Sequence, residues 1–389
     1  MITVATADNA LKSFYLDAVT DALDMKINPF LARIQKTTAD VVGKDIKKLV
    51  KVGYNGGIGA GSETGDLPTA TASDYVQFTS TLKNLYGTIE ISDKALRASA
   101  NNEGAFVNLL NDEMQSMIKS ASFNFGRMLF GDGTGAISTV TAIPQTNNIV
   151  LESVNGIVEG MKLDFYTPLG ELKEMCIGRI VDAVDRARNM ITITGIEINS
   201  TVLAPGSKAY LHGSKDQEIT GIDALFSESE TLYGVDKSKS IMKPYFMEDI
   251  GDITDSIIQK AMDDIEAASG SKVNYIVCSW GVRRALMQYC RENDIPLPAM
   301  EVDGMMALSF YGVPVVVDRF CAPGTMYLLN TDNFKLYQLC DWQWLEGEDG
   351  KILKQVPGKP VYTATLVKYA ELMCDRPCGQ GKLMGITEA

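Results

Sequence analysis

Residues 103–135 read EGAFVNLLNDEMQSMIKSASFNFGRMLFGDGTG and contain the clearest helical pattern in the chain. From Phe106 to Met128, apolar residues recur at the three- and four-residue spacing that lines one face of a helix. A turn-rich run, Gly131 to Gly135, then stops the helix. About 27 residues at ~1.5 Å each give a rod of roughly 40 Å, more than twice the usual helix length. We therefore predict a spine helix that crosses one face of the molecule.

The region before the spine helix changes from helix-like to strand-like. Residues 6–24 have the spacing of an amphipathic helix, and residues 25–50 are mixed. Six glycines then crowd between Gly53 and Gly65, and alternating strand-like residues follow as far as Ile91. This pattern predicts a long β excursion with a flexible tip, ordered only where something else covers it. A basic cluster before the glycines is typical of a solvated face and comprises Lys44, Lys47, Lys48 and Lys51.

The region after the spine helix divides into two parts. Residues 136–219 read almost wholly as short strands separated by Gly and Pro, which predicts a small β barrel or sandwich. Residues 220–389 return to a mixed α/β pattern. There we expect helices over 250–268 and 281–293, buried strands over 275–278, 310–318 and 325–330, longer strands over 334–344 and 362–372, and a tight acidic turn over 347–351.

Composition limits the kinds of partner. The chain of 389 residues has a net charge of −13, so it has no general attraction for nucleic acid, whose phosphates need a surplus of Lys and Arg. No apolar run approaches the roughly 20 residues of a membrane span, and no basic segment precedes an apolar core at the N-terminus as in a secretory signal. The seven cysteines are odd in number and scattered, which predicts buried free thiols in a reducing cytosol.

Candidate catalytic and metal sites are weak. The glycine-rich segment from Gly53 to Gly65 contains no lysine and opens into strand residues, unlike a phosphate loop. The run from Gly131 to Gly135 has no partner acids at calcium-loop spacing. His212 is the only histidine, so it would have to serve every triad or zinc site. We expect no cofactor and no metal, and this pattern favours a structural protein over an enzyme.

Four stretches resemble the HK97-fold major capsid proteins of tailed bacteriophages. They are Leu67 to Leu96, which is similar to the descending strand of the family's E-loop; Phe130 to Gly135 with the later Thr220-Gly221-Ile222; Tyr311 to Asp318 with Pro323 to Asp332; and Tyr362 to Pro377, which resembles the last long strand. Their order and spacing carry the resemblance. It implies an α+β fold with axial and peripheral domains, an E-loop hairpin and a long spine helix, plus an inserted all-β barrel or sandwich.

The resemblance also implies a division of the chain. The expected parts are 1–50, N-terminal helix and arm; 51–91, E-loop; 92–135, peripheral domain with the spine helix; 136–219, β insertion; 220–331, axial domain; and 332–389, peripheral strands, acidic loop and C-terminal segment. About 50 residues precede the E-loop, which implies a separate scaffolding protein or earlier processing. The E-loop stretch from Gly53 to Thr81 lacks the lysine with which some relatives form an isopeptide cross-link; Lys51 and Lys83 lie only at its base.

The implied function is assembly of an icosahedral head shell in the host cytoplasm. The implied partners are other copies of the chain in pentamers and hexamers, a scaffolding protein, a portal and a decoration protein, around double-stranded DNA that is enclosed without specific binding. Expected assembly contacts are Gly56, Gly57, Gly61, Glu63, Asp66 and Pro68 in the E-loop tip, and Glu346, Glu348, Asp349 and Lys351 in the peripheral loop. Three alternatives stay open: an encapsulin-type compartment, a carbohydrate-binding or adhesion protein built on residues 136–219, and an unrecognised two-domain enzyme.

Overall fold

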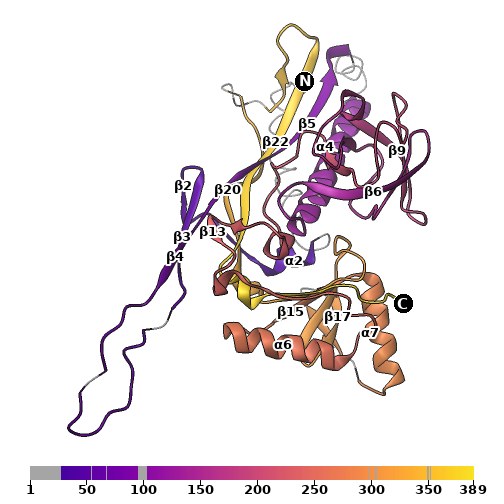
Figure 1. Cartoon of the computed structure of the whole chain (residues 1–389). Coiled ribbons are helices and arrows are strands. Elements are labelled where there is room, and N and C mark those ends of the chain that lie inside the picture. Colours follow the sequence, from indigo (N-terminus) through magenta and orange to yellow (C-terminus); the bar gives the residue numbers. More distant parts are fainter. Residues whose placement is uncertain are drawn as a thin grey trace.

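The spine helix is α4, Glu103–Leu129, and it lies between a long sheet and a barrel (Figure 1). The computed structural model describes residues 28–53, 55–66, 68–94, 103–296, 298–302, 305–347, 350 and 352–389, so the helix predicted over 6–24 lies outside the described residues. Phe125 of α4 packs edge-on against Trp342 of the sheet, with 6.3 Å between ring centroids. Phe123, two residues earlier, belongs to the barrel core. One helix therefore supplies apolar side chains to two separate cores.

The long sheet has five strands, β1 (Gln35–Thr37), β5 (Lys83–Ser92), β20 (Phe334–Trp344), β21 (Lys354–Gln355) and β22 (Val361–Cys374). Its centre is β22, which pairs antiparallel with β5 from Val361 to Ala370 and with β20 from Leu366 to Cys374. Short α2 (Pro29–Arg33) closes one end, where Phe30 contacts Phe334 at 5.4 Å between ring centroids. The long strands predicted over 334–344 and 362–372 are confirmed.

A narrow three-stranded sheet forms the base of a projecting hairpin. Its strands are β2 (Val41–Val42), β3 (Asp45–Lys51) and β4 (Tyr75–Thr81), and Figure 1 shows the hairpin extending away from the body. The prediction that 25–50 is a mixed arm with a solvated lysine face is wrong here, because β3 begins at Asp45. Burial alternates along β3, but the sequence does not show it, because two lysines follow Ile46 and the apolar Leu49 and Val50 are adjacent.

Residues 136–211 form a closed barrel. Its strands are β6 (Ala136–Gln145), β7 (Asn148–Leu151), β8 (Lys162–Tyr166), β9 (Arg179–Asp185), β10 (Met190–Ile193) and β11 (Lys208–Leu211), in the closed order β10-β7-β6-β11-β8-β9. A one-turn helix, η1 (Glu174–Cys176), precedes β9. Ile149, Leu163, Phe165 and Ile191 are wholly buried in a core of the barrel's own. Of the two architectures the strand pattern allowed, the barrel is the one present.

A seven-stranded sheet with two helices forms the remaining part. Its order is β14 (Tyr245–Met247), β23 (Gly381–Leu383), β19 (Met326–Leu329), β15 (Tyr275–Cys278), β18 (Val313–Val317), β17 (Met305–Phe310) and β16 (Ala299–Val302). Helix α6 (Asp255–Ser269) begins after Thr254, whose hydroxyl accepts a hydrogen bond from the Ile257 amide, and α7 (Trp280–Glu292) begins after Ser279 in the same way. Short connecting elements are α5 (Asp223–Phe226), β12 (Thr231–Leu232), β13 (Val235–Asp236), η2 (Ser240–Met242), η3 (Thr331–Asn333) and η4 (Pro377–Gly379).

Two expectations for this part differ from the structure. The buried strand predicted over 310–318 is present as β18, but it begins at Val313, because Tyr311 and Gly312 adopt φ values of 48° and 85° and turn the chain between β17 and β18. The chain's last residues were expected with the strands of 332–389, yet β23 pairs with β14 and β19 of the seven-stranded sheet. The helix predicted from residue 250 begins at Asp255.

All seven cysteines are free; five are buried and Cys340 and Cys378 are half-buried.

The end of α4 is held against the segment that returns from the barrel. The Ile222 amide donates to the Leu129 carbonyl at 2.8 Å. A Cβ on Gly221 would lie 2.5 Å from the Gly131 oxygen, 2.7 Å from the Leu129 oxygen and closer still to the Met128 oxygen. Only glycine allows the two backbones to approach this closely. The two motifs Gly131–Gly135 and Thr220–Ile222, which lie far apart in the sequence, thus form one junction.

We predict that Gly221→Ala lowers the free energy of unfolding by about 3 kcal/mol, because the added methyl would have to displace three backbone carbonyls. The measurement is urea unfolding of the unassembled chain. Gly131→Ala is the matched control: its Cβ would come no nearer than 3.4 Å to any atom, so it should cost less than about 1 kcal/mol. Equal losses in the two variants would contradict the close-approach explanation.

Candidate assembly surfaces

The hairpin tip, residues 55–66 and 68–73, projects beyond the paired strands. Pairing ends where the Val52 and Gly53 amides both donate to the Asp74 carbonyl, and the tip itself lies outside any strand. The predicted contact residues Gly56, Gly61, Glu63, Asp66 and Pro68 are all exposed there, and Gly57 is half-buried. Exposed backbone donors and acceptors of this kind can pair with another chain.

The two arms of the tip run close together although they form no ladder. Asn55 links them, because its side-chain oxygen accepts hydrogen bonds from the Gly57 amide at 2.9 Å and from the Thr71 hydroxyl at 3.0 Å. A Cβ on Gly59 would lie 3.2 Å from Pro68. The glycines therefore let the arms approach each other, and the tip behaves as one narrow finger.

The base of the hairpin is anchored to the body by Tyr233, in the turn between β12 and β13. Its carbonyl accepts a hydrogen bond from the Thr79 amide at 2.9 Å, and its ring lies 5.8 Å from that of Phe78. Its hydroxyl accepts from the Cys374 amide at 3.3 Å, at the end of β22. Burial raises the pKa of this tyrosine well above its usual value, so it stays neutral. Nothing in the sequence marked Tyr233, because its role comes from contacts with two distant strands.

An ion pair between Lys48 and Asp375 adds a second anchor. Burial alone would lower the pKa of Lys48, but the bond to Asp375 raises it above its ordinary value. The lysine cluster is therefore not uniformly solvated as predicted: Lys48 faces the body, whereas Lys47 and Lys51 are exposed. Alternation along β3 separates the two groups.

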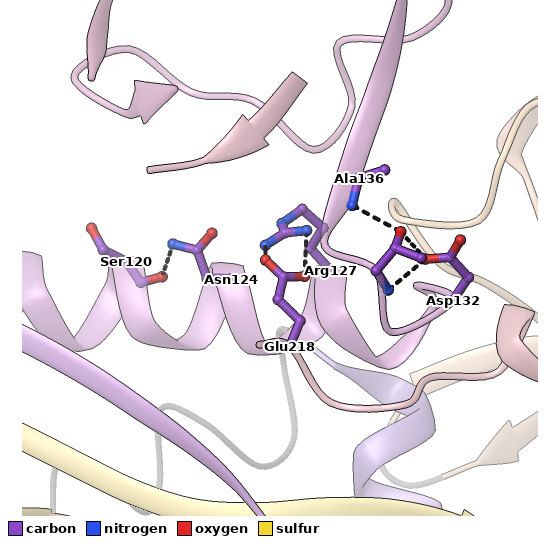
Figure 2. Close-up of polar contacts among 7 residues, drawn as sticks. Ser120, Asn124, Arg127, Asp132, Ala136 and Glu218 are labelled. Atoms are coloured by element: carbon purple, nitrogen blue, oxygen red, sulfur yellow. Dashed lines mark hydrogen bonds and ion pairs between the residues drawn. The ribbon is translucent and has the colours of Figure 1, made fainter. Parts of the chain in front are cut away.

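The junction at the end of α4 contains a buried ion pair (Figure 2). Arg127 donates through both terminal nitrogens to Glu218, at 2.9 and 2.5 Å, and both side chains are less than one-tenth exposed. The adjacent turn is fixed by Asp132, whose carboxylate accepts from the Thr134 amide and hydroxyl at 2.9 and 2.6 Å. The spine helix is thereby tied to both chain segments that connect it with the barrel.

Glu371, near the end of β22, contacts the same junction. It is fully buried, and one carboxyl oxygen accepts from the Thr220 amide at 2.7 Å. The other oxygen has no hydrogen-bond partner among the described residues. Burial raises the pKa of Glu371 to about 7, although the Thr220 bond acts in the opposite direction. A proton on this carboxyl is therefore part of the folded state in mildly acidic solution.

The predicted peripheral-loop contacts are only partly described. Glu346 is exposed just beyond the end of β20, whereas Glu348, Asp349 and Lys351 lie outside the described residues.

His212 lies beside the buried carboxylate of Asp164 in the barrel. Its Nδ1 lies 2.8 Å from Asp164, but that carboxylate also accepts hydrogen bonds from the Gly178 and Gly213 amides at 2.7 and 3.0 Å. Asp164 thus holds three barrel segments together, which is a structural role.

Within the described ranges, no three His, Cys, Asp or Glu side chains gather as a metal site would require. No helix in the same ranges is both long and apolar enough to cross a membrane.

Comparison with solved structures identifies the fold. The chain superimposes on the cyanophage A-1(L) capsid asymmetric unit with a TM-score of 0.55 and 12% identity, over 93% of each chain. The chain has the HK97-like capsid fold. The capsid of Myoviridae phage XM1 (TM-score 0.47, 9% identity, 93% and 92% covered) is a more distant likeness. The holo-SrpI encapsulin complex from Synechococcus elongatus PCC 7942 is another (TM-score 0.45, 10% identity, 93% and 89% covered).

Sequence comparison alone gives no relative of this capsid fold. No model of a known protein family matches the chain. No curated protein sequence matches it either. The likeness is therefore carried by the arrangement of the strands and the spine helix.

We predict that Glu371→Gln is stabilised relative to the wild type as the pH rises from about 4.5 to about 7. In the wild type the unfolded chain ionises this carboxyl near 4.5 and the folded chain only near 7, so stability present below pH 4.5 is lost up to pH 7. The amide cannot ionise, so the difference in unfolding free energy should grow by on the order of 3 kcal/mol across that window. Urea unfolding at a series of pH values measures it, with the exposed Glu171→Gln as control; a constant difference for Glu371→Gln would contradict the explanation.

We also predict that Glu218→Leu lowers the unfolding free energy by about 3–5 kcal/mol, because it leaves the Arg127 guanidinium buried without its counter-charge. The double variant Arg127→Leu/Glu218→Leu removes both charges and should recover most of the loss. Denaturant unfolding of both variants measures this. A double variant as unstable as the single one would show that the pair does more than neutralise its own charges.

Proposed function

We propose that this chain is the major capsid protein of a tailed bacteriophage, which assembles into the icosahedral shell around the phage's double-stranded DNA. The observation that carries the proposal is a capsid fold with a hairpin tip that buries almost nothing against its own chain. Such a tip gains stability only by covering another molecule. An assembly of many copies provides that partner at every position.

The main assembly contact, in this proposal, is the hairpin of one copy lying on its neighbour. Exposed backbone in the tip offers hydrogen bonds, and each contact is weak by itself. Many such contacts, closed by symmetry into pentamers and hexamers, give a stable shell. The exposed Glu346 and the acidic turn after it would form a second contact, whose charges make assembly sensitive to salt.

The remaining parts of the proposal follow from charge and from the capsid fold. With a net charge of −13, the shell would contain DNA without gripping it. We propose no enzymatic activity, assembly in the host cytoplasm, and a separate scaffolding protein, a portal and possible decoration of the surface as partners. Residues 136–219 would be an insertion between the spine helix and the axial domain.

We predict that replacing residues 54–73 by Asn-Gly abolishes shells while sparing the fold of the single chain. Gly53 and Asp74 already face each other, so a two-residue turn can close the shortened hairpin. The measurement is negative-stain electron microscopy of wild type and variant, expressed with and without a scaffolding protein. Circular dichroism and the urea midpoint control for folding.

Uniform hollow wild-type shells that protect DNA from nuclease would support the proposal, and shells filled with a cargo protein would favour an encapsulin-type compartment. A wild-type chain that stays monomeric in every condition would overturn both. Normal shells from the shortened variant would overturn the assigned role of the hairpin.

A further inference from the structure

The paired base of the hairpin, β3 and β4, has one buried and one exposed face. Ile46, Val76 and Phe78 are buried against the body. The opposite face presents Lys47, Leu49 and Lys51 on β3, paired with Thr79, Gln77 and Tyr75 on β4. We call this set of six residues the ribbon face.

The ribbon face is both cationic and apolar. Leu49 is 66% exposed and Tyr75 is 53% exposed, and the strand register makes them diagonal neighbours. Lys47 and Lys51 flank Leu49 on the same strand, although Lys51 also has contacts within the chain. Leu49 lies between the two lysines along β3, and Tyr75 is directly opposite Lys51 on β4. This cationic and apolar patch lies on the surface of a chain with 49 acidic and 36 basic residues.

The hairpin tip has the complementary chemistry. Between Val52 and Asp74 there is no Lys or Arg, whereas Glu63, Asp66 and Asp74 are acidic. Glu63 and Asp66 are exposed, and Ile58 is the most exposed large apolar residue described, at 90%. Carboxylates around one apolar side chain match lysines around Leu49 and Tyr75.

The tip of a given chain does not reach its own ribbon face. Its arms are linked to each other through Asn55 and the close approach of Gly59 to Pro68, so the finger continues outward from β3 and β4. Figure 1 shows it extending away from both the ribbon and the body. A hairpin tip that occupies the ribbon face therefore comes from a second copy.

We propose that the ribbon face of one copy is the docking surface for the hairpin tip of the next copy, with Glu63 and Asp66 opposite Lys47 and Lys51 and with Ile58 against Leu49 and Tyr75. This inference rests on the proposed function and specifies which surface receives the tip. The contact is head-to-tail, since the two surfaces differ, and such contacts close into rings when the rotation between copies allows it. The Tyr233 and Lys48 anchors contribute by holding each ribbon face at a fixed angle to its body.

The test is charge reversal with rescue. Lys47→Glu/Lys51→Glu and Glu63→Lys/Asp66→Lys should each reduce the assembled fraction by about tenfold or more, because like charges then meet across the contact. The chain that carries all four changes should assemble to within about threefold of the wild type, since the attraction is restored with reversed sign. Rescue cannot arise from a folding defect, because the second pair of changes repairs no damage within one chain.

The matched control is Lys162→Glu/Lys208→Glu, which makes the same charge change at two exposed strand lysines on the barrel. It should assemble like the wild type. Full assembly of either hairpin reversal, or no rescue in the fourfold variant, would overturn the inference and leave the proposed function intact.

A second measurement does not depend on shells. A chain with both Ile58→Cys and Leu49→Cys should form disulfide-linked oligomers on mild oxidation. Peptide mapping should find the disulfide between positions 58 and 49 in this double variant and in neither single variant. If the double variant does not form that linkage, whether or not it assembles into shells, the proposed contact is wrong.

Discussion

The backbone of Gly221 lies against the last turn of α4, and this close approach holds the chain segments around it in place. Two helical carbonyls and that of Gly131 surround the position of a missing side chain, so the segment returning from the barrel is held against the end of the spine helix. Arg127 and Glu218 neutralise each other beside it, and Glu371 contributes a carboxyl to it. The segment that returns from the barrel therefore contacts both the spine helix and β22 of the long sheet at this junction.

The hairpin has the opposite character, because its base is rigid and its tip is not covered. Tyr233 and Lys48 attach the base to strands at the far end of the chain, whereas the tip relies on Asn55 and on contact between its two arms. A rigid base fixes the direction in which the finger points. A tip without buried surface leaves its backbone and its carboxylates available to another molecule. This division suits a protein that folds alone and then assembles.

The barrel is largely independent of both features. Its core is separate from that of the long sheet, and among the described residues only the α4 side chain Phe123 and the partly buried Phe320 reach it from outside. Asp164 holds its strands together through hydrogen bonds to His212 and to the Gly213 amide. A closed barrel also has no free strand edge, so it adds no uncontrolled pairing surface to a chain whose hairpin already offers one.

The features that could be predicted from the sequence are those that depend on local periodicity and on fixed turn chemistry. The spine helix, the strands β15, β20 and β22, the short strands of the barrel and the helix stop at Gly131–Gly135 all follow from the spacing of apolar residues and glycines. The exposed tip was predictable for the same reason, because six glycines and few apolar residues cannot build a core. Features that depend on partners far along the chain could not be predicted in this way. They are β3, whose apolar residues do not alternate in the sequence; Lys48, which faces Asp375 instead of water; Tyr233, which joins Thr79 to Cys374; and β23, which completes a sheet begun more than a hundred residues earlier. Each of these is fixed by the chemistry of a neighbour that only folding brings close, and a linear pattern carries no record of that neighbour.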